Sequence, residues 1–519
     1  MQKSFTILIL FMLTLALTGS PSRVTFSDAS IPAQIQTDAT LVASFIHAAS
    51  CSQADVEAAI DAASDGDFVL IPAGHCTWTT PASNEPSVTI NQKGITLLGA
   101  GIDQTVITDG TTTEWNETPL RVDGVEGKPF RITGFTFVGN GQNDSFPVIQ
   151  VNGECTDWRI DHIKFNDAKR AVSTSGYTYG VIDHCTFSNQ TYDFPYQAIA
   201  VSADDNSWQR PLALGTANAV YIEDCLFDYT QFGNTVDGHI GARFVFRHNT
   251  LNSTYVEAHG FCCSLSRGTF SYEVYSNTIT GNSASWVPFA FRGGTGVVFD
   301  NAVGGHFEFP HIEIYNDRSC PDRAWQGVCD GTSPVDGNQD SSGYPCRDQI
   351  GRSTDLAGGQ QTLEPLYEWN NTYNGSDVDV KLNPGLCTQM ANHLKENRDF
   401  YNDTPRPGYT PYVYPHPLTK DLVLSGAPAD QAIHLSWQIK TILPLISTWR
   451  IDYTSQAGTA YLPVTGIVSS TYTYTLTGLT DYVWYTVTLN AMLDSTRFLT
   501  DTVRVMPTDR LVYLPLIMR

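Results

Sequence analysis

Residues Ile132–Phe137 (ITGFTF) begin a six-residue frame that recurs as far as Val303. Each copy has an apolar residue at its first and last positions, and successive copies start 22 to 40 residues apart. The other copies are Ile160–Phe165 (IDHIKF), Ile182–Phe187 (IDHCTF), Ile222–Phe227 (IEDCLF), Phe246–Leu251 (FRHNTL), Val274–Ile279 (VYSNTI) and Val298–Val303 (VFDNAV). Their Ile, Val, Phe, Thr and Tyr content predicts short strands. Because one short strand cannot bury its apolar face alone, the repeat predicts a stacked architecture.

The fourth position of the frame becomes asparagine in the last three copies, at Asn249, Asn277 and Asn301. Stacked asparagine amides hydrogen-bond to one another and satisfy turn backbone. These residues, and the segment Gly66–Gly74 (GDFVLIPAG), resemble the right-handed parallel β-helix of the pectate-lyase-like superfamily. We therefore predict an all-β chain in which residues 45–320 form a right-handed parallel β-helix, with the seven copies stacked in one sheet. The resemblance implies a fold more strongly than an activity, since one fold hosts many functions.

The first residues of the chain predict that the protein is exported from the cell. Lys3 precedes the apolar run Phe5–Leu17, and small residues follow, which is typical of a secretory signal over residues 1–20. Residues 21–44 are polar and predict a linker. The apolar run is short for a membrane span, and no later run is long enough. We expect a secreted or cell-surface protein without a transmembrane span after removal of the signal.

The acidic composition limits the kinds of ligand that the chain is expected to bind. The net charge is −23 and the isoelectric point is about 4.7. We expect no nucleic-acid partner, because binding the phosphate backbone requires basic patches, and we expect a monomer. The acidic composition leaves a Ca²⁺ ion open as a cofactor, but no residue is assigned as a metal ligand. No structural zinc is predicted, since no Cys or Cys/His cluster has zinc-like spacing.

Eleven cysteines are compatible with an oxidising compartment. Cys51 and Cys76 flank a predicted cap and form the first expected disulfide. The cap itself is a short helix at Asp55–Ala63, preceded by Ser52 as a capping residue. The cysteines of the loop-rich region are expected to pair among themselves; they are Cys320, Cys329, Cys346 and Cys387. Cys185 and Cys225 share a frame position, where buried thiols are favoured over a disulfide.

Two further segments follow the repeat. Residues 321–420, which continue a stretch rich in Gly, Pro, Asp, Asn and Cys, are expected to lie along the β-helix and close its C-terminal end. Residues 421–508 carry short strand patterns that predict a small β-sandwich. The apolar tail 509–519 is either a sorting or anchoring signal or the last strand of this domain.

The order Trp437, Tyr453, Leu479 and Tyr485 resembles a fibronectin type III domain. The resemblance implies that Trp437 lies in the core and that Tyr485 makes a hydrogen bond at a corner of the sandwich. A carbohydrate-binding sandwich is the alternative.

The interval Ser188–Ala219 is longer than its neighbours and carries Asp204, Asp205 and Trp208. Long loops of stacked repeats cluster on the binding face, so these three residues are candidates for substrate binding. The alternative is a surface excursion that packs on its own aromatic side chains.

Three basic side chains stand six or seven residues before a frame copy, and equal phase on successive turns places them on one face; they are His239, Arg267 and Arg292. Glu257 and His259 flank Ala258, so both should point outward. The predicted catalytic residues are His259, Arg267 and Arg292, and the remaining predicted substrate-binding residues are His239, Arg243 and Glu257.

Such a column suits an acidic polysaccharide, because guanidinium groups pair bidentately with carboxylates. Cleavage of a uronate by β-elimination needs a positive charge on the carboxylate, a base for the C5 proton and an acid for the leaving oxygen. Arg267 and Arg292 would supply the charge, and His259 the base or acid. The lyase family's Arg-x-Pro-x-x-Arg segment is absent. The competing interpretation is that both arginines brace the turns by pairing with Glu257, Glu273 or Asp300.

Two other functions stay open. The first is a glycoside hydrolase, which needs two carboxylates flanking the bond. Asp204-Asp205 followed by His259-Gly260 is faintly similar to the polygalacturonase pattern of an Asp pair and Gly-His-Gly, with Ala258 in place of the first glycine. The second is a non-catalytic glycan-binding or adhesin β-helix protein.

Overall fold

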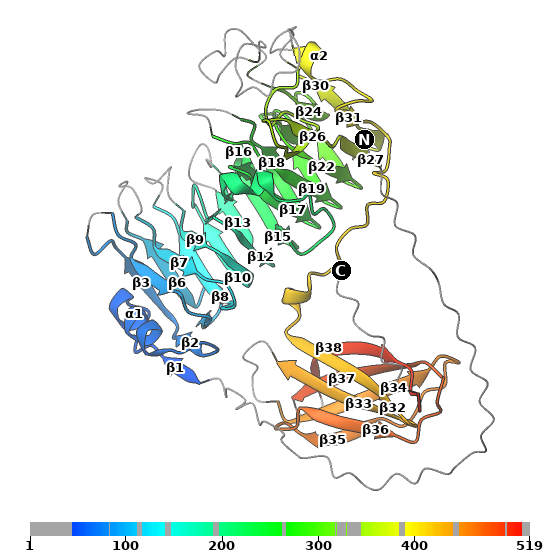
Figure 1. Cartoon of the computed structure of the whole chain (residues 1–519). Helices are drawn as coiled ribbons and strands as arrows, with labels where there is room; N and C mark the ends of the chain where they lie inside the picture. The colour runs from blue at the N-terminus through cyan, green and yellow to red at the C-terminus, as the bar shows by residue number, and fades with distance from the viewer. Residues whose placement is uncertain are drawn as a thin grey trace, which may run out of the picture. The chain divides into compact units, whose positions relative to one another are not determined.

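The computed structural model describes residues 44–82, 84–111, 117–140, 147–189, 197–261, 266–316, 318, 329, 344–383, 390–439, 446–493 and 496–510. The predicted signal, nearly all of the linker, residues 511–519, Cys320 and Cys387 lie outside these ranges. As predicted, the chain is all-β, with a parallel β-helix followed by a small β-sandwich (Figure 1). None of the described helices is long and apolar enough to cross a membrane.

Three parallel ladders of strands form the β-helix. The first ladder contains β1 (Phe45–His47), β2 (Phe68–Ile71), β5 (Thr96–Gly99), β8 (Arg131–Val138), β10 (Cys155–Asn166), β12 (Thr178–Asp183), β15 (Val220–Glu223), β17 (Arg243–Arg247), β19 (Ser271–Tyr275), β22 (Thr295–Phe299), β27 (Leu366–Trp369) and β31 (Phe400–Tyr401). The second ladder contains β3 (Gly74–Trp78), β6 (Thr105–Asp109), the ends of β8 and β10, β13 (Thr186–Asn189), β16 (Leu226–His239), β18 (Thr250–Ala258), β20 (Thr278–Gly281), β23 (Ala302–Gly305) and β28 (Thr372–Tyr373).

The third ladder carries the residues discussed below as a candidate site. It contains β4 (Val88–Asn91), β7 (Leu120–Gly124), β9 (Ile149–Gly153), β11 (Val172–Ser175), β14 (Ile199–Ser202), the ends of β16 and β18, β21 (Phe289–Phe291), β24 (Ile312–Ile314) and β30 (Val380–Leu382). β16 and β18 are long because each bends from the second ladder into the third.

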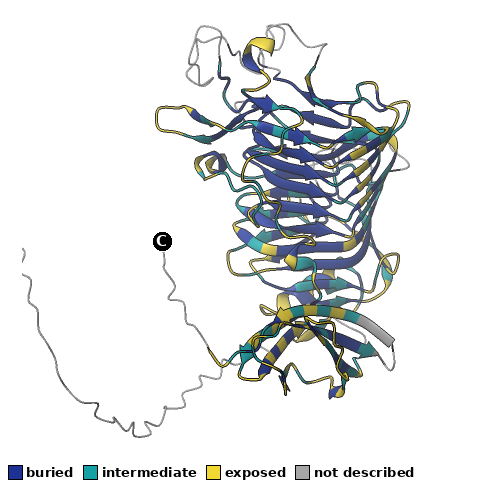
Figure 2. Cartoon of the chain, turned by 90° about the vertical axis from the view of Figure 1, so that its right-hand side faces the viewer, coloured by how far each residue is buried: buried dark blue, intermediate teal, exposed yellow. Residues whose placement is uncertain are grey.

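The frame copies stack in parallel register, as predicted, but each copy crosses from the first ladder to the second and does not lie within one ladder. Ile160 pairs with both Ile132 and Ile182, and the same column continues through Ile222, Phe246, Val274 and Val298. The last frame position forms a second column, in which Phe187 stacks on Phe227 with ring centroids 4.5 Å apart. Both columns face the interior, which is buried along the coil (Figure 2).

The predicted asparagine ladder is present and is one turn longer than expected. Asn249 N donates to Asn277 Oδ1 at 2.9 Å, and Asn277 N donates to Asn301 Oδ1 at 3.1 Å. Asn301 N then donates to Asn371 Oδ1 at 3.2 Å. Asn371 belongs to an eighth copy of the frame, whose first residue, Glu368, pairs with Val298.

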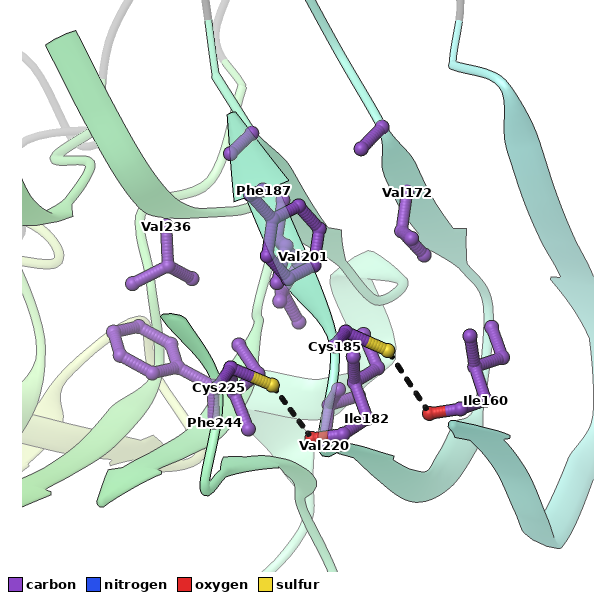
Figure 3. Packing of buried hydrophobic residues seen from close by; sticks show 14 of the residues in the cluster. Ile160, Val172, Ile182, Cys185, Phe187, Val201, Val220, Cys225, Val236 and Phe244 are labelled. Atoms are coloured by element: carbon purple, nitrogen blue, oxygen red, sulfur yellow. Dashed lines mark hydrogen bonds between the residues drawn. The ribbon is translucent and has the colours of Figure 1, made fainter. Parts of the chain in front are cut away.

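The cysteines follow the predictions where they are described. Cys51 and Cys76 form a disulfide beside the capping helix α1 (Gln53–Ala62), whose first turn is capped by Ser52. A second disulfide joins Cys329 and Cys346. Cys185 and Cys225 are buried free thiols on adjacent turns (Figure 3). Each contacts a backbone carbonyl of the preceding turn, namely those of Ile160 and Ile182.

The β-helix continues past the predicted boundary at residue 320. β27, β28, β30 and β31 extend all three ladders, and β29 (Ser376–Asp377) pairs back on β28. A small antiparallel pair, β25 (Arg352–Asp355) and β26 (Gln361–Leu363), and the short helix α2 (Met390–His393) complete this region. The repeat was missed here because a glutamate, not an apolar residue, occupies the first frame position.

Residues 403–421 form a strap along the outer face of the first ladder. Tyr409 contacts Glu273, His416 N donates to Glu223 Oε1 at 2.7 Å, and Asp421 accepts from Arg159 Nη1 at 3.0 Å. The strap includes the helical turn η5 (Pro417–Thr419). Because these contacts descend the ladder, the strap runs back across earlier turns.

The C-terminal domain packs two antiparallel sheets. One contains β32 (Leu422–Ala429), β33 (Ala432–Ile439) and β36 (Thr473–Thr477), and the other β34 (Thr448–Ser455), β35 (Val464–Val468), β37 (Tyr485–Leu493) and β38 (Thr496–Val505). Trp437 is buried in the core between them, as predicted. Tyr485 Oη accepts from Thr480 N at 3.1 Å, which is the expected corner hydrogen bond.

Candidate active site

Two neighbouring strand ends of the third ladder repeat the order apolar, acid, small, histidine. Val236–His239 (VDGH) ends β16, and Val256–His259 (VEAH) lies at the end of β18. Asp237 pairs with Glu257, which pairs in turn with Ala290 of β21. Since the intervening small residues face the core, both acids point outward.

The backbone pairing continues one residue beyond these acids. His259 N donates to the carbonyl of Gly238 at 2.9 Å, and Arg292 N donates to the carbonyl of Ala258 at 2.8 Å. His239, His259 and Arg292 therefore follow one another on successive turns. The imidazole rings of His239 and His259 stack with their centroids 4.0 Å apart.

Asp237 connects the two histidines. Its Oδ2 lies 2.7 Å from His239 Nε2 and 3.2 Å from His259 Nδ1. The same oxygen accepts from Gln197 Nε2 at 2.6 Å, and Gln197 is oriented by Arg170, which donates to its Oε1 at 2.7 Å. The carboxylate is 1% exposed, and its Oδ1 is buried without a hydrogen-bond partner.

Glu257 forms the second half of the cluster. Its Oε2 accepts from Asn234 Nδ2 at 2.7 Å and from Tyr255 Oη at 3.1 Å. Its Oε1 pairs with Arg292 Nη2, and this guanidinium nitrogen also contacts His259 Nδ1. The arginine therefore links a buried carboxylate to an imidazole.

Burial and mutual charge set the protonation of these groups. Burial opposes the charge on Asp237, but His239 and His259 outweigh it and hold the pKa of this carboxyl well below its usual value. Burial raises the pKa of Glu257 to about 7, although Arg292 acts in the opposite direction. Burial lowers the pKa of His259 to about 4 despite the attraction of Asp237. At neutral pH the cluster thus holds an ionised Asp237, a neutral His259 and a Glu257 close to half-protonated.

The ionised carboxylate defines the imidazole tautomers. Asp237 is the stronger acceptor for the His259 Nδ1 proton, and Arg292 has Glu257 as its own acceptor. A guanidinium N–H cannot donate to a ring nitrogen that already carries a proton. We therefore assign the hydrogen bond of Arg292 to Glu257, and the protons to His239 Nε2 and His259 Nδ1, which face Asp237. The lone pairs then lie on His239 Nδ1 and His259 Nε2, so each ring offers a basic nitrogen on the side away from the carboxylate.

The structure brings together four of the predicted site residues: His239, Glu257, His259 and Arg292. Arg292 pairs with Glu257, as the competing brace interpretation expected, but the pair lies beside the two imidazoles.

The expectation that Arg267 lines an open groove is wrong. Arg267 is buried and holds Asp348 Oδ2 and Asp355 Oδ2 at 2.8 and 2.9 Å, so it braces the closing segment against the β-helix. The chain leaves the ladder after His259, and pairing with the preceding turn resumes at Arg267 and Gly268, whose carbonyls accept from Ile240 N and Gly241 N at 3.0 and 2.8 Å. Arg267 therefore lies at the end of this excursion, and His259 occupies the position that counting had given to Arg267.

Two of the predicted substrate-binding residues, Trp208 and Arg243, serve packing instead. Trp208, in the helical turn η1 (Asp205–Gln209), is fully buried and donates to the carbonyl of Gly268 at 3.0 Å. Arg243 is buried and holds the loop through the carbonyl of Ser207 at 2.9 Å. Asp204 pairs with Arg210 at 3.2 Å. The side chain of Asp205 lies outside the description.

Four residues of the cluster were missed by the sequence analysis; they are Asp237, Gln197, Asn234 and Tyr255. A sequence signal for Asp237 was available, because VDGH and VEAH have the same order of residue types, with Asp237 in the place of Glu257. Gln197 and Asn234 carry no such signal, since Gln197 reaches the site from the segment before β14 and Asn234 from the bend of β16 between the second and third ladders.

A second acidic cluster lies among the last turns. Carboxylate oxygens of Glu368, Asp379 and Asp403 lie within 4.8 Å of one another. Both Glu368 oxygens are already hydrogen-bonded, to Asp403 N at 2.8 Å and Asn371 Nδ2 at 3.0 Å. Glu368 therefore joins residues of the last turns through its own hydrogen bonds.

No family model and no curated protein sequence match the chain. Among solved structures, the A-module of the Azotobacter vinelandii mannuronan C-5 epimerase AlgE6 is 14% identical, with 68% of this chain and 96% of that chain covered at a TM-score of 0.28. The A-module of AlgE4 from the same organism is 15% identical, with 51% and 94% covered at a TM-score of 0.25. At these values no residue role is transferred, and the fold assignment rests on the ladders themselves.

Proposed function

We propose that the chain is a secreted polysaccharide-active enzyme that acts on an acidic, uronate-containing glycan as a lyase, by β-elimination. One observation carries the proposal: a buried carboxylate orients two stacked imidazoles beside an arginine–glutamate pair. These groups can supply the positive charge, the base and the acid that the reaction needs. They stand on paired strands, which hold catalytic geometry better than loops.

The reaction begins when Arg292 pairs with the uronate carboxylate. This removes the guanidinium from Glu257 and His259, so His259 becomes more basic and Glu257 takes up a proton more readily. His259 Nε2 accepts the C5 proton, and Asp237 stabilises the imidazolium. Glu257 donates its proton to the leaving oxygen as the bond between C4 and that oxygen breaks and a C4–C5 double bond forms. One binding event thus prepares both base and acid.

The test is a screen of the purified full chain against uronate-containing polysaccharides. Unsaturated products that appear together with new reducing ends support the lyase. Reducing ends without unsaturation indicate a hydrolase. Deuterium incorporation at C5 without chain cleavage would show proton abstraction without elimination. Glycan binding without any product would support the adhesin alternative.

A glycoside hydrolase is the second candidate, and a specific observation favours it. Asp237 and Glu257 are paired on neighbouring strands, with the pKa of Asp237 lowered and that of Glu257 raised to about 7. An ionised carboxylate beside a protonated one is the arrangement that glycosidases use. Against it, Asp237 is 1% exposed, so it is poorly placed to reach a sugar ring.

The pH profile should show both titrations. The reaction requires neutral His259, which exists above its pKa of about 4, and protonated Glu257, which exists below its pKa of about 7. We expect kcat/KM to be bell-shaped with limbs near these values. Because bound substrate withdraws Arg292, both limbs of kcat should lie at higher pH. A kcat/KM that still rises above pH 8 would contradict the role of Glu257.

The proposed setting is extracellular. Residues 1–20 are proposed as the secretory signal and 421–508 as a separable, fibronectin-like module. The described disulfides support an oxidising environment.

A further inference from the structure

The three inner residues of the candidate active site have the composition of a transition-metal site. Asp237, His239 and His259 each offer one ligand atom, and these atoms lie within 4.8 Å of one another. Two imidazoles and one carboxylate form a ligand set that binds zinc, iron or manganese and leaves further coordination positions open. The sequence hides this set, because its histidines lie 20 residues apart on different turns.

The geometry of this ligand set needs little adjustment. Ligand atoms about 2.0–2.2 Å from an ion lie roughly 3–3.5 Å from one another, and Asp237 Oδ2 is 2.7 and 3.2 Å from the two ring nitrogens. Asp237 Oδ1 is buried and without a hydrogen-bond partner. If the carboxylate bound the ion through both oxygens, this oxygen would gain a coordination bond. The histidine side chains are 25% and 17% exposed, which leaves the ion a way in.

Arg292 opposes a cation at this point. Its guanidinium contacts His259 Nδ1 and must leave that nitrogen before an ion can bind there. It can keep its pair with Glu257 while it does so. The Arg292 guanidinium and a metal ion therefore compete for the position beside His259 Nδ1.

We infer that Asp237, His239 and His259 bind a divalent transition-metal ion of the zinc class, and that the ion and the catalytic base exclude each other. A neutral imidazole has one proton. When the metal takes His259 Nδ1, that proton must sit on Nε2, and the lone pair that would accept the C5 proton is lost. When the metal takes His239 Nε2, the proton of that ring must likewise move to Nδ1. The ion thus inhibits by switching tautomers, a consequence that rests on the proposed function, whereas the metal binding itself does not.

The binding test uses untagged, chelator-treated full chain and zinc chloride alone, followed by calorimetry. We expect one ion per chain at this site, and His239→Ala should weaken its binding at least about 100-fold, since even second-shell changes cost roughly 10–100-fold. The matched control is His184→Ala. His184 also pairs with an aspartate and stacks on a histidine, His162, at 5.2 Å, but it lies in the turn after β12. It should leave this ion in place.

Arg292→Ala gives the sharpest discrimination. Removal of the competing positive charge should tighten zinc binding about tenfold or more, while the same change abolishes turnover under the proposed mechanism. A merely structural arginine would not move the two readouts in opposite directions. Unchanged or weaker zinc binding in this variant would contradict the competition.

The tautomer switch has a readout that needs no substrate. In protein labelled with ¹⁵N-histidine, the His259 Nε2 resonance should change from unprotonated to protonated when zinc is added. Absence of zinc binding, or binding unaffected by His239→Ala and Asp237→Asn, overturns the site. If zinc binds as expected but no glycan is turned over, the proposed function fails and the metal site stands. If zinc occupies the site and turnover is undiminished, the exclusion fails.

Discussion

Replacing His259 with alanine is expected to lower kcat on the substrate polysaccharide by about 10²–10⁴-fold, the usual contribution of a positioned general base. His259 is the only imidazole among the described residues that Asp237 orients and Arg292 also contacts. Its substitution leaves Arg292 and Glu257 paired, so binding of the glycan should change much less than turnover. The measurement is initial rate against substrate concentration, which separates kcat from KM.

His184→Ala is the matched control for this experiment. Its ring Nδ1 lies 2.8 Å from Asp183 Oδ2, as His259 Nδ1 faces Asp237, so the substitution removes the same kind of contact. The residue belongs to the turn after β12 and lies outside the proposed site. Its variant should keep wild-type kcat. Equal losses in both variants would point to general destabilisation, and a His259→Ala enzyme with full turnover would remove the base from the mechanism.

The β-helix was predictable because its physics is local and repeated. Strand side chains alternate, so a slip of one residue would move Ile160 from the core to the solvent. The frame therefore determined the register of Ile132, Ile160 and Ile182 before the structure confirmed it. The eighth turn escaped because Glu368 replaces the apolar residue, and its buried carboxylate is satisfied by Asp403 and Asn371 instead.

The site was predictable only in part, for a geometric reason. The site residues were predicted by counting residues back from the frame copies, which begin on the first ladder. This works where the segment that connects the third ladder to the first has constant length, and it located His239. It failed for Arg267, because the excursion after His259 adds residues between the third ladder and the first. Counting along the third ladder itself, through VDGH and VEAH, needs no assumption about connections.

Burial was the second quantity that the sequence did not contain. Trp208 and Arg243 are residue types found on sugar-binding surfaces, yet both are buried: Trp208 lies within the long loop, and Arg243, on β17, is covered by that loop. Arg267 looks like a carboxylate ligand and is one, but its carboxylates are those of Asp348 and Asp355, which come from more than 80 residues later in the chain. Only the tertiary fold brings such partners together.

Arg267→Ala is therefore expected to lower the free energy of unfolding of the β-helix by about 3–5 kcal/mol, the cost of removing one partner from a buried ion pair. Asp348 is fully buried, and its oxygens also accept from Gly268 N at 3.0 Å and Gln361 Nε2 at 2.8 Å. These bonds would hold the carboxylate in place after its counter-charge is gone. Urea unfolding followed by tryptophan fluorescence would measure the loss, since Arg267 stacks 4.7 Å over Trp208.

A partly exposed arginine pair provides the control. Arg121 and Asp123 are paired at 3.0 Å on the third ladder, with side chains 26% and 31% exposed. Arg121→Ala should change the free energy of unfolding by at most about 1 kcal/mol, because solvent screens such pairs. Adding Asp348→Asn to Arg267→Ala removes the uncompensated charge and should recover part of the stability. If Arg267→Ala instead lost activity while unfolding like the wild type, Arg267 would be a substrate ligand. The structural role assigned to its pairs with Asp348 and Asp355 would then be wrong.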